Sequence, residues 1–207
     1  MDSTVRVAAA LGGLLIVSLA GGCGAPVKAP ESYVKHEPQE AIFHCELPEG
    51  WTNTGGGKKS TSLQWVRSKK GGCMIHGTTD ISSSVMGDIA GSFNNLGGDD
   101  QQLTKEQLEE RAPVHSVHQM NMRKVDPDEY GSYKEEGKPI KFTASLSEGR
   151  KSVFTARVGA GKKVKGYRAT LLAQNNGLTF YCYCPVKDFE KFQPAFDKVL
   201  ESVKHGH

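Results

Sequence analysis

Residues 164–184 read VKGYRATLLAQNNGLTFYCYC and contain the clearest hairpin signal in the chain. Two runs rich in apolar, β-branched and aromatic residues, 164–174 and 178–184, flank the triplet Asn175-Asn176-Gly177. Asn and Gly tolerate the positive φ angles of tight hairpin turns, so the pattern predicts two antiparallel strands joined directly. Antiparallel pairing of neighbouring strands is therefore the expected rule for the sheet.

Further strands and helices are predicted on both sides of this hairpin. Extended segments are expected at 41–47, 62–67, 73–81, 114–123, 138–146 and 151–158. Helical spacing of apolar residues predicts a helix over 84–96, a capping-box pattern predicts a short helix from Thr104, and a C-terminal helix is expected mainly from Pro194. The order of these elements predicts one α+β domain over 41–204, mainly an antiparallel sheet with helices packed on its faces, and a short tail over 205–207.

The first 22 residues have the character of a signal peptide. Arg6 precedes an apolar run over 7–20, which as a helix would rise about 20 Å against a hydrocarbon core of about 30 Å. Leu19-Ala20-Gly21-Gly22-Cys23 resembles a bacterial lipobox, which implies that residues 1–22 are removed and that the thiol of Cys23 carries lipid. Cleavage by the ordinary signal peptidase and an uncleaved anchor are the alternatives.

The segment after Cys23 is predicted to be a flexible tether. Residues 24–40 contain Pro26, Pro30 and Pro38, mixed charges and no hydrophobic period. Fully extended, they would reach roughly 55 Å. We therefore expect a domain of the cell envelope that faces the periplasm or the outside. Gly24, in place of the Asp that retains lipoproteins in the inner membrane, favours the outer membrane.

The domain itself resembles the PsbP-like family. The segment FHCELPEGW at 43–51 resembles the opening strand and turn of these domains, and 166–169, 177–182 and 189–203 resemble their closing strands and helix. The resemblance implies an antiparallel sheet with helices on both faces, an α/β/α sandwich. It also implies a role in protein docking, without a catalytic residue set to transfer. Region 99–140 is longer than the usual connection in this family.

Four cysteines remain after Cys23, namely Cys45, Cys73, Cys182 and Cys184. In an oxidising compartment an even number suggests two disulfides, and three pairings are possible. Cys182 and Cys184 point the same way on a strand about 6.6 Å apart, so they are not expected to pair with each other. The alternatives are buried thiols that act as small apolar residues, or a metal or haem site that uses Cys182 and Cys184 with His44, His76 or Cys73.

Basic residues gather in the predicted turns. The net charge of +3 is too small to indicate nucleic-acid binding. If the basic turns share one end of the sheet, they form a contact face for anionic headgroups or an acidic partner, and otherwise they are solvated turns. The residues of this possible face are Lys58, Lys59, Lys69, Lys70, Arg150, Lys151, Lys162, Lys163 and Lys165.

The function expected from the sequence is that of a lipid-anchored binding or docking domain with another envelope protein as partner. No cofactor and no enzymatic activity are expected, because neither glycine-lysine segment has P-loop spacing and no nucleophile motif occurs. The alternatives are a small redox, metal or haem protein that uses the cysteines, or an enzyme with a loop-built site around His115 and His118.

Overall fold

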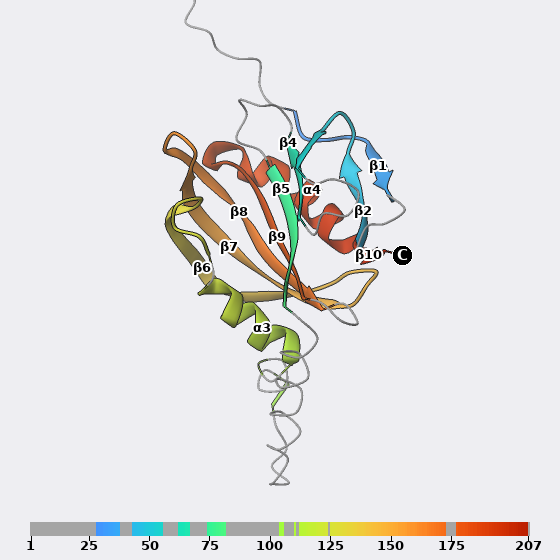
Figure 1. Cartoon of the computed structure of the whole chain (residues 1–207), viewed down its shortest axis with the longest axis vertical. Helices are drawn as coiled ribbons and strands as arrows, with labels where there is room; N and C mark the ends of the chain where they lie inside the picture. Colours follow the sequence, from blue (N-terminus) through green and yellow to red (C-terminus); the bar gives the residue numbers. More distant parts are fainter. Residues whose placement is uncertain are drawn as a thin grey trace, which may run out of the picture.

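The structure is a computed structural model of the 207-residue chain, shown in Figure 1. It describes residues 28–37, 43–55, 62–66, 74–81, 104–105, 110, 112–123, 125–172 and 177–206. Within these ranges the chain forms two antiparallel sheets, two α-helices and one 3₁₀ turn. No helix in the described ranges is long and apolar enough to cross a membrane.

The larger sheet has seven strands in the order β3-β4-β5-β9-β8-β7-β6. Its members are β3 (Thr52–Gly55), β4 (Ser62–Val66), β5 (Met74–Ile81), β6 (Gly131–Thr143), β7 (Glu148–Val158), β8 (Lys162–Leu172) and β9 (Gly177–Pro185). The predicted hairpin is confirmed, because β8 and β9 pair antiparallel from Val164 opposite Pro185 to Leu172 opposite Gly177. Gly166 permits this pairing, since a Cβ there would lie 2.1 Å from the carbonyl oxygen of Cys182.

One face of this sheet is covered by helix α4 (Phe189–Glu201) and by a small sheet. The small sheet consists of β1 (Tyr33–His36), β2 (Phe43–Pro48) and β10 (Lys204–His205), and the 3₁₀ turn η1 (Val186–Asp188) leads into α4. Figure 1 shows α4 beside β2 and β10, close to the C-terminus. Phe43 of β2 meets Phe180 of β9 edge to face, with ring centroids 5.0 Å apart. This side therefore holds the main hydrophobic core of the domain.

The opposite face carries helix α3 (Pro113–Met122), which packs on β7 and β8. Beside α3 lies a second buried cluster, in which Tyr130 stacks on Tyr181 with centroids 4.8 Å apart and meets Phe154 edge to face. Helices thus cover both faces of an antiparallel sheet. The predicted α+β class and the implied α/β/α sandwich are confirmed.

Two expectations about local structure are wrong. Residues 114–123 are mostly helical and not extended, because Pro113 begins α3 and the buried positions Val114, Val117, His118 and Asn121 follow helical spacing. Helix α4 begins at Phe189 and contains Pro194 in its interior. A proline at position 194 has no amide hydrogen to donate to the carbonyl oxygen of Glu190, four residues earlier. Both residues are exposed, so water can bond to that carbonyl oxygen instead.

The expected tether also contains structure. Tyr33–His36 form β1, which pairs antiparallel with β2 from Tyr33 opposite Pro48 to His36 opposite Cys45. Lys198 of α4 lies over the Tyr33 ring, 4.0 Å from its centroid. The four residues of β1, Tyr-Val-Lys-His, do not alternate between apolar and polar, so no strand pattern marks them among the prolines and charges of this segment. The helix predicted over 84–96, most of the short helix from Thr104, and the signal peptide lie outside the described residues.

Candidate functional site

Helix α3 is held on the sheet through polar side chains. His118 is fully buried, with Nδ1 3.0 Å from Oγ1 of Thr170 on β8 and Nε2 2.8 Å from Oγ of Ser152 on β7. Asn121, one turn later, donates from Nδ2 to Oγ1 of Thr179 on β9 at 2.9 Å. Because these partners lie on three adjacent strands, the helix has one position and one rotation relative to the sheet.

The environment of His118 keeps its imidazole neutral. Burial and the positive charge of Arg168 lower the pKa of His118 to about 2. The side chain of Arg168 is itself 1% exposed, donates from Nη1 to the carbonyl oxygen of His118 at 2.8 Å, and donates from Nε to Oε1 of Glu135 at 2.5 Å. A histidine with both ring nitrogens bonded inside the protein serves structure, not proton exchange with a ligand.

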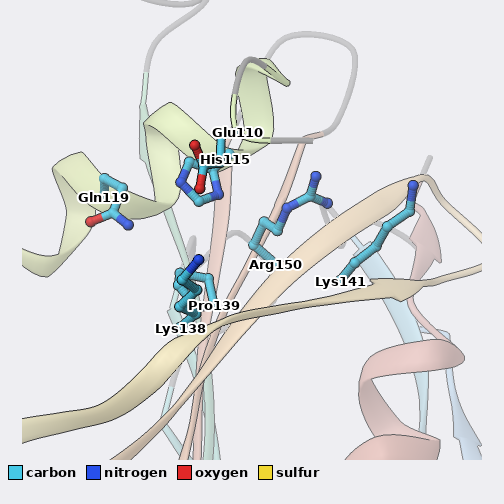
Figure 2. Close-up of a pocket in the computed structure, with 7 residues that line it drawn as sticks. All are labelled: Glu110, His115, Gln119, Lys138, Pro139, Lys141 and Arg150. Atoms are coloured by element: carbon cyan, nitrogen blue, oxygen red, sulfur yellow. The ribbon is translucent and has the colours of Figure 1, made fainter. Parts of the chain in front are cut away.

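The outer side of α3 forms one wall of a cleft of about 200 Å³. Figure 2 shows His115 on α3 above Lys138 and Pro139 of β6, with Arg150 of β7 to one side. The residues that line the cleft are Glu110, His115, Gln119, Lys138, Pro139, Lys141 and Arg150. His115 and Gln119 both line it because they are four residues apart on the helix.

Cationic side chains line the strand side of the cleft, and two of them share one carboxylate. Arg150 is buried and donates from Nη1 to Oε1 of Glu148 at 2.6 Å and to the carbonyl oxygen of Gly149 at 3.0 Å. Lys141 also pairs with Glu148. Burial opposes ionisation of Glu148, but the hydrogen bonds from Lys141 and Arg150 outweigh it and lower the pKa of this carboxyl group.

The pKa of His115 is affected by burial and by nearby charges. Burial and the positive charge of Arg150 lower its pKa, while Glu110 acts in the opposite direction. The ring is therefore neutral at pH 7 and presents one donor and one acceptor nitrogen. Of the two histidines expected to form a loop-built site, only His115 lines the cleft, and it does so from a helix.

The structure separates the residues of the predicted basic face. Lys162, Lys163 and Lys165 lie at the start of β8, next to the turn at 159–161, while Arg150 and Lys151 lie near the start of β7. In the hairpin register Lys165 is opposite Thr155 and Lys162 is opposite Val158, so these lysines lie four to seven positions, about 13–23 Å, from Lys151 along the strands. Lys58, Lys59, Lys69 and Lys70 lie outside the described residues.

Arg150 and Lys151 are also not surface residues. As neighbours on one strand they point to opposite faces of the sheet, Arg150 toward α3 and Lys151 toward α4. Lys151 pairs with Asp197 of α4 at 2.5 Å and lies over the Tyr167 ring, 4.6 Å from its centroid. The described residues therefore do not form one contact face out of these basic positions.

The cysteines that the structure describes are buried thiols. Cys45 of β2 and Cys182 and Cys184 of β9 lie in the main hydrophobic core, and the structure has all three as thiols and not as halves of the expected disulfides. Burial raises the pKa of Cys45 to about 12 and also raises that of Cys182. Cys23 and Cys73 lie outside the described residues.

Among the residues that the structure describes, no group of three or more His, Cys, Asp or Glu side chains is arranged to hold a metal ion. His44 is buried on β2, and the side chain of His76 lies outside the described residues.

The comparisons with known proteins bear on the fold. No protein-family model and no curated protein sequence matches the chain. The chain is similar in structure to the cyanobacterial PsbP protein CyanoP from Synechocystis sp. PCC 6803, with a TM-score of 0.54 and 13% identity over 90% of this chain and 98% of that one. LpqN, described as involved in cell envelope biogenesis of Mycobacterium tuberculosis, gives 10% identity, 85% and 91% coverage, and a TM-score of 0.39, too low to establish a common fold. The chain has a PsbP-like fold.

The sequence indicated only part of the cleft. Sequence patterns point to His115 as part of a loop-built site and to Arg150 as part of a basic face. They do not indicate the other lining residues, which are Glu110, Gln119, Lys138, Pro139 and Lys141. The four-residue spacing of His115 and Gln119 would have placed both on one helix face if the segment had been recognised as a helix. No local pattern indicates that β6 crosses beneath that face.

Proposed function

We propose that this chain is a lipid-anchored protein of the cell envelope whose PsbP-like domain binds another envelope protein and carries out no catalysis. The observation that carries the proposal is the lipobox-like segment that ends at Cys23, a few residues before a folded PsbP-like domain. Several acyl chains, at about 0.8 kcal/mol per buried methylene, hold a protein on a bilayer durably.

The position of strand β1 limits how far the domain can lie from the membrane. Because β1 begins at Tyr33, only residues 24–32 separate the lipidated cysteine from the folded domain. Nine residues reach about 30 Å when fully extended, which is roughly half the reach expected of a 17-residue tether. The domain would therefore stay close to the membrane surface and meet partners that are themselves embedded in it or bound to it.

The buried side chains support a binding role over the two alternatives. The high pKa of the Cys45 thiol and its position in the hydrophobic core disfavour redox or haem chemistry at the cysteines. His118 is engaged by Ser152 and Thr170, so a catalytic pair with His115 is disfavoured as well.

The anchor is tested by metabolic labelling of the producing bacterium with an alkyne-bearing fatty acid. The wild-type protein should carry the label and sediment with membranes, and Cys23→Ser should lose both. Cys184→Ser is the matched control, since it removes a thiol of the folded domain and should keep the label. Label that persists in Cys23→Ser would contradict the proposal.

The binding role is tested by in-cell crosslinking of the tagged lipoprotein, followed by mass spectrometry of the captured proteins. The expected result is one or a few envelope proteins whose yield falls in Cys23→Ser at equal protein levels. Capture of the same proteins at the same yield without the anchor would show that membrane attachment does not serve the interaction.

A further inference from the structure

We propose that a groove at the turn end of the β7–β8 hairpin binds the phosphate groups of an anionic phospholipid bilayer and orients the domain on it. This inference rests on the proposed function, because the lipid anchor is what brings the groove to a bilayer. It deepens that function by naming the face of the domain that meets the membrane. Its basis is a pair of like charges without acidic partners, the lining of the groove, and the position of the groove relative to the tether.

The centre of the groove is a pair of like charges. Arg157 of β7 is directly opposite Lys163 of β8, so both side chains lie on the same face of the sheet, with Cβ atoms about 5 Å apart. Like charges at directly opposite positions of an antiparallel pair destabilise a sheet. A phosphate group bound between the two side chains would relieve this repulsion.

These two cations differ from their neighbours in having no acidic partner. Four other basic residues of β7 and β8 pair with carboxylates, namely Arg150, Lys151, Lys165 and Arg168. Within the described residues, the side chain of Arg157 has one hydrogen bond, a long one of 3.4 Å from Nη1 to the carbonyl oxygen of Gly161, and the ammonium group of Lys163 has none. Both side chains are exposed, so their remaining N–H donors are open to a ligand.

The lining of the groove suits the boundary between lipid headgroups and acyl chains. The groove has a volume of about 190 Å³, and its lining combines the two cations with Ala156, Val164 and Val186 and with Ser132 and Thr155. None of these described residues is acidic, and Asp188 of η1 and Glu190 of α4 lie outside the lining. A guanidinium and an ammonium group bind phosphate oxygens, while Val186, which is 46% exposed, suits the adjoining apolar layer.

The folded domain meets its tether at the same end. Tyr33, the first residue of β1, is opposite Pro48, and Trp51 shortly after Pro48 contacts Phe192 in the first turn of α4, with ring centroids 6.4 Å apart. The 3₁₀ turn η1, which carries Val186, leads into that turn of α4. Both the start of β1 and the turn between β7 and β8 lie in the upper part of Figure 1. A short tether therefore holds this end of the domain toward the bilayer.

The charge of the hairpin end predicts a preference for anionic bilayers. Residues 157–165 include no acidic residue, and Lys187 beside Val186 is also exposed. Each Lys or Arg that reaches an anionic membrane surface strengthens binding about fivefold. Arg157 and Lys163 together should therefore favour an anionic over a neutral surface by about 25-fold, and high salt should remove this preference.

The experiment measures which methyl groups lie next to the bilayer. The full-length protein, with Val and Ile methyl groups labelled with carbon-13, is reconstituted into phosphatidylcholine nanodiscs with or without phosphatidylglycerol, each containing a lipid whose headgroup chelates gadolinium. Val186 and Ile140 are 46% and 45% exposed, and Ile140 is opposite Lys151, about 20 Å from Arg157 along β7. Gadolinium should broaden the Val186 signal severalfold more than the Ile140 signal in anionic nanodiscs, and about equally in neutral ones. Val186→Ala and Ile140→Leu assign the two signals.

Three variants make the result specific. The double variant Arg157→Gln with Lys163→Gln should lose the excess broadening of Val186. Lys163→Glu should lose it as well, and should raise the midpoint of urea unfolding because it replaces a like-charge pair by an opposite-charge pair. Lys141→Gln, which removes an exposed cation opposite Arg150 on β6, is the control and should keep the excess.

The outcomes separate the groove from the anchor. Elution of the protein with both kinds of nanodisc, but with equal broadening of Val186 and Ile140, would overturn this inference and leave the anchor intact. Elution of the wild-type protein without nanodiscs would overturn both proposals. A Val186 signal that shifts with an added polyglutamate peptide, but is not broadened in anionic nanodiscs, would assign the groove to an acidic protein and overturn the membrane contact.

Discussion

The Nε2 atom of His118 lies 2.8 Å from the hydroxyl oxygen of Ser152, and this contact joins the middle of α3 to β7 at the position where Ser152 is paired with Arg168 of β8. Thr170 holds the other ring nitrogen from the next strand. A neutral imidazole has one donor and one acceptor nitrogen, and a hydroxyl group can fill either role, so both contacts are satisfied without any charge.

The stability of the domain should therefore fall at acidic pH because of His118. Its pKa is about 2 in the folded state and about 6.5 in an unfolded chain. Between these values the unfolded chain binds a proton that the folded protein does not, so the free energy of unfolding decreases as the pH falls below about 6.5, by about 1.4 kcal/mol per pH unit. Urea unfolding at pH 6.5 and pH 4.5 should differ by about 2 kcal/mol from this group, because the full slope is reached only below pH 6.5.

The variant His118→Gln isolates that effect. An amide side chain can bond to both hydroxyl groups and does not titrate, so the variant should lose most of the pH dependence between 6.5 and 4.5 whatever its absolute stability. An identical pH slope in the variant and the wild type would assign the effect to other groups.

The buried pair of Arg168 and Glu135 should couple strongly. The two side chains are 1% and 12% exposed and lie 2.5 Å apart, so removal of one partner leaves a buried charge without compensation. Arg168→Met should lower the free energy of unfolding by about 3–5 kcal/mol, and Arg168→Met with Glu135→Gln should recover part of the loss. A double-mutant cycle in urea measures this coupling.

A partly exposed ion pair between the same two strands, β8 and β6, provides the comparison with the buried pair. Lys165 and Glu136 lie 2.8 Å apart but are partly exposed, so Lys165→Met should cost at most about 1 kcal/mol. Equal costs for the buried and the exposed pair would contradict the argument from burial.

The thiols of Cys45, Cys182 and Cys184 should be unreactive in the folded protein. Burial excludes reagents, and a pKa of about 12 leaves almost no thiolate at Cys45 at pH 7.5. In a chain with Cys23→Ser and Cys73→Ser, iodoacetamide at pH 7.5 should modify none of the three. After unfolding in urea without reductant it should modify all three. Modification in urea that requires a reductant would mean that disulfides form after all.

Strand β1 should protect the tether from proteolysis. Lys35 is exposed but lies within β1, whereas Lys28 precedes the strand. Trypsin should therefore cut after Lys28 much faster than after Lys35 in the wild-type protein. Tyr33→Ala removes the ring that Lys198 covers and should accelerate cleavage after Lys35 severalfold, with cleavage after Lys28 unchanged as the internal control. Mass spectrometry of the early fragments distinguishes the two cuts.

Local sequence was sufficient for the strands that carry regular patterns. The hairpin of β8 and β9 follows from Asn175-Asn176-Gly177 between two apolar runs, and the apolar stripe of α4 follows from the spacing of Phe189, Phe192 and Phe196. The signal for α3 was missed because its buried face includes His118 and Asn121. A pattern based on hydrophobicity does not register polar residues whose hydrogen bonds lie on other elements.

By itself the sequence determined the class of the domain, its antiparallel pairing and its two most regular elements, because turn geometry and side-chain periodicity act over a few neighbouring residues. Only the tertiary structure decided that Lys151 pairs with Asp197 of α4, and that His115 and Lys138, 23 positions apart, line one cleft. These relationships depend on which strand lies beneath which helix. That is set by the packing of the whole domain and not by any single segment.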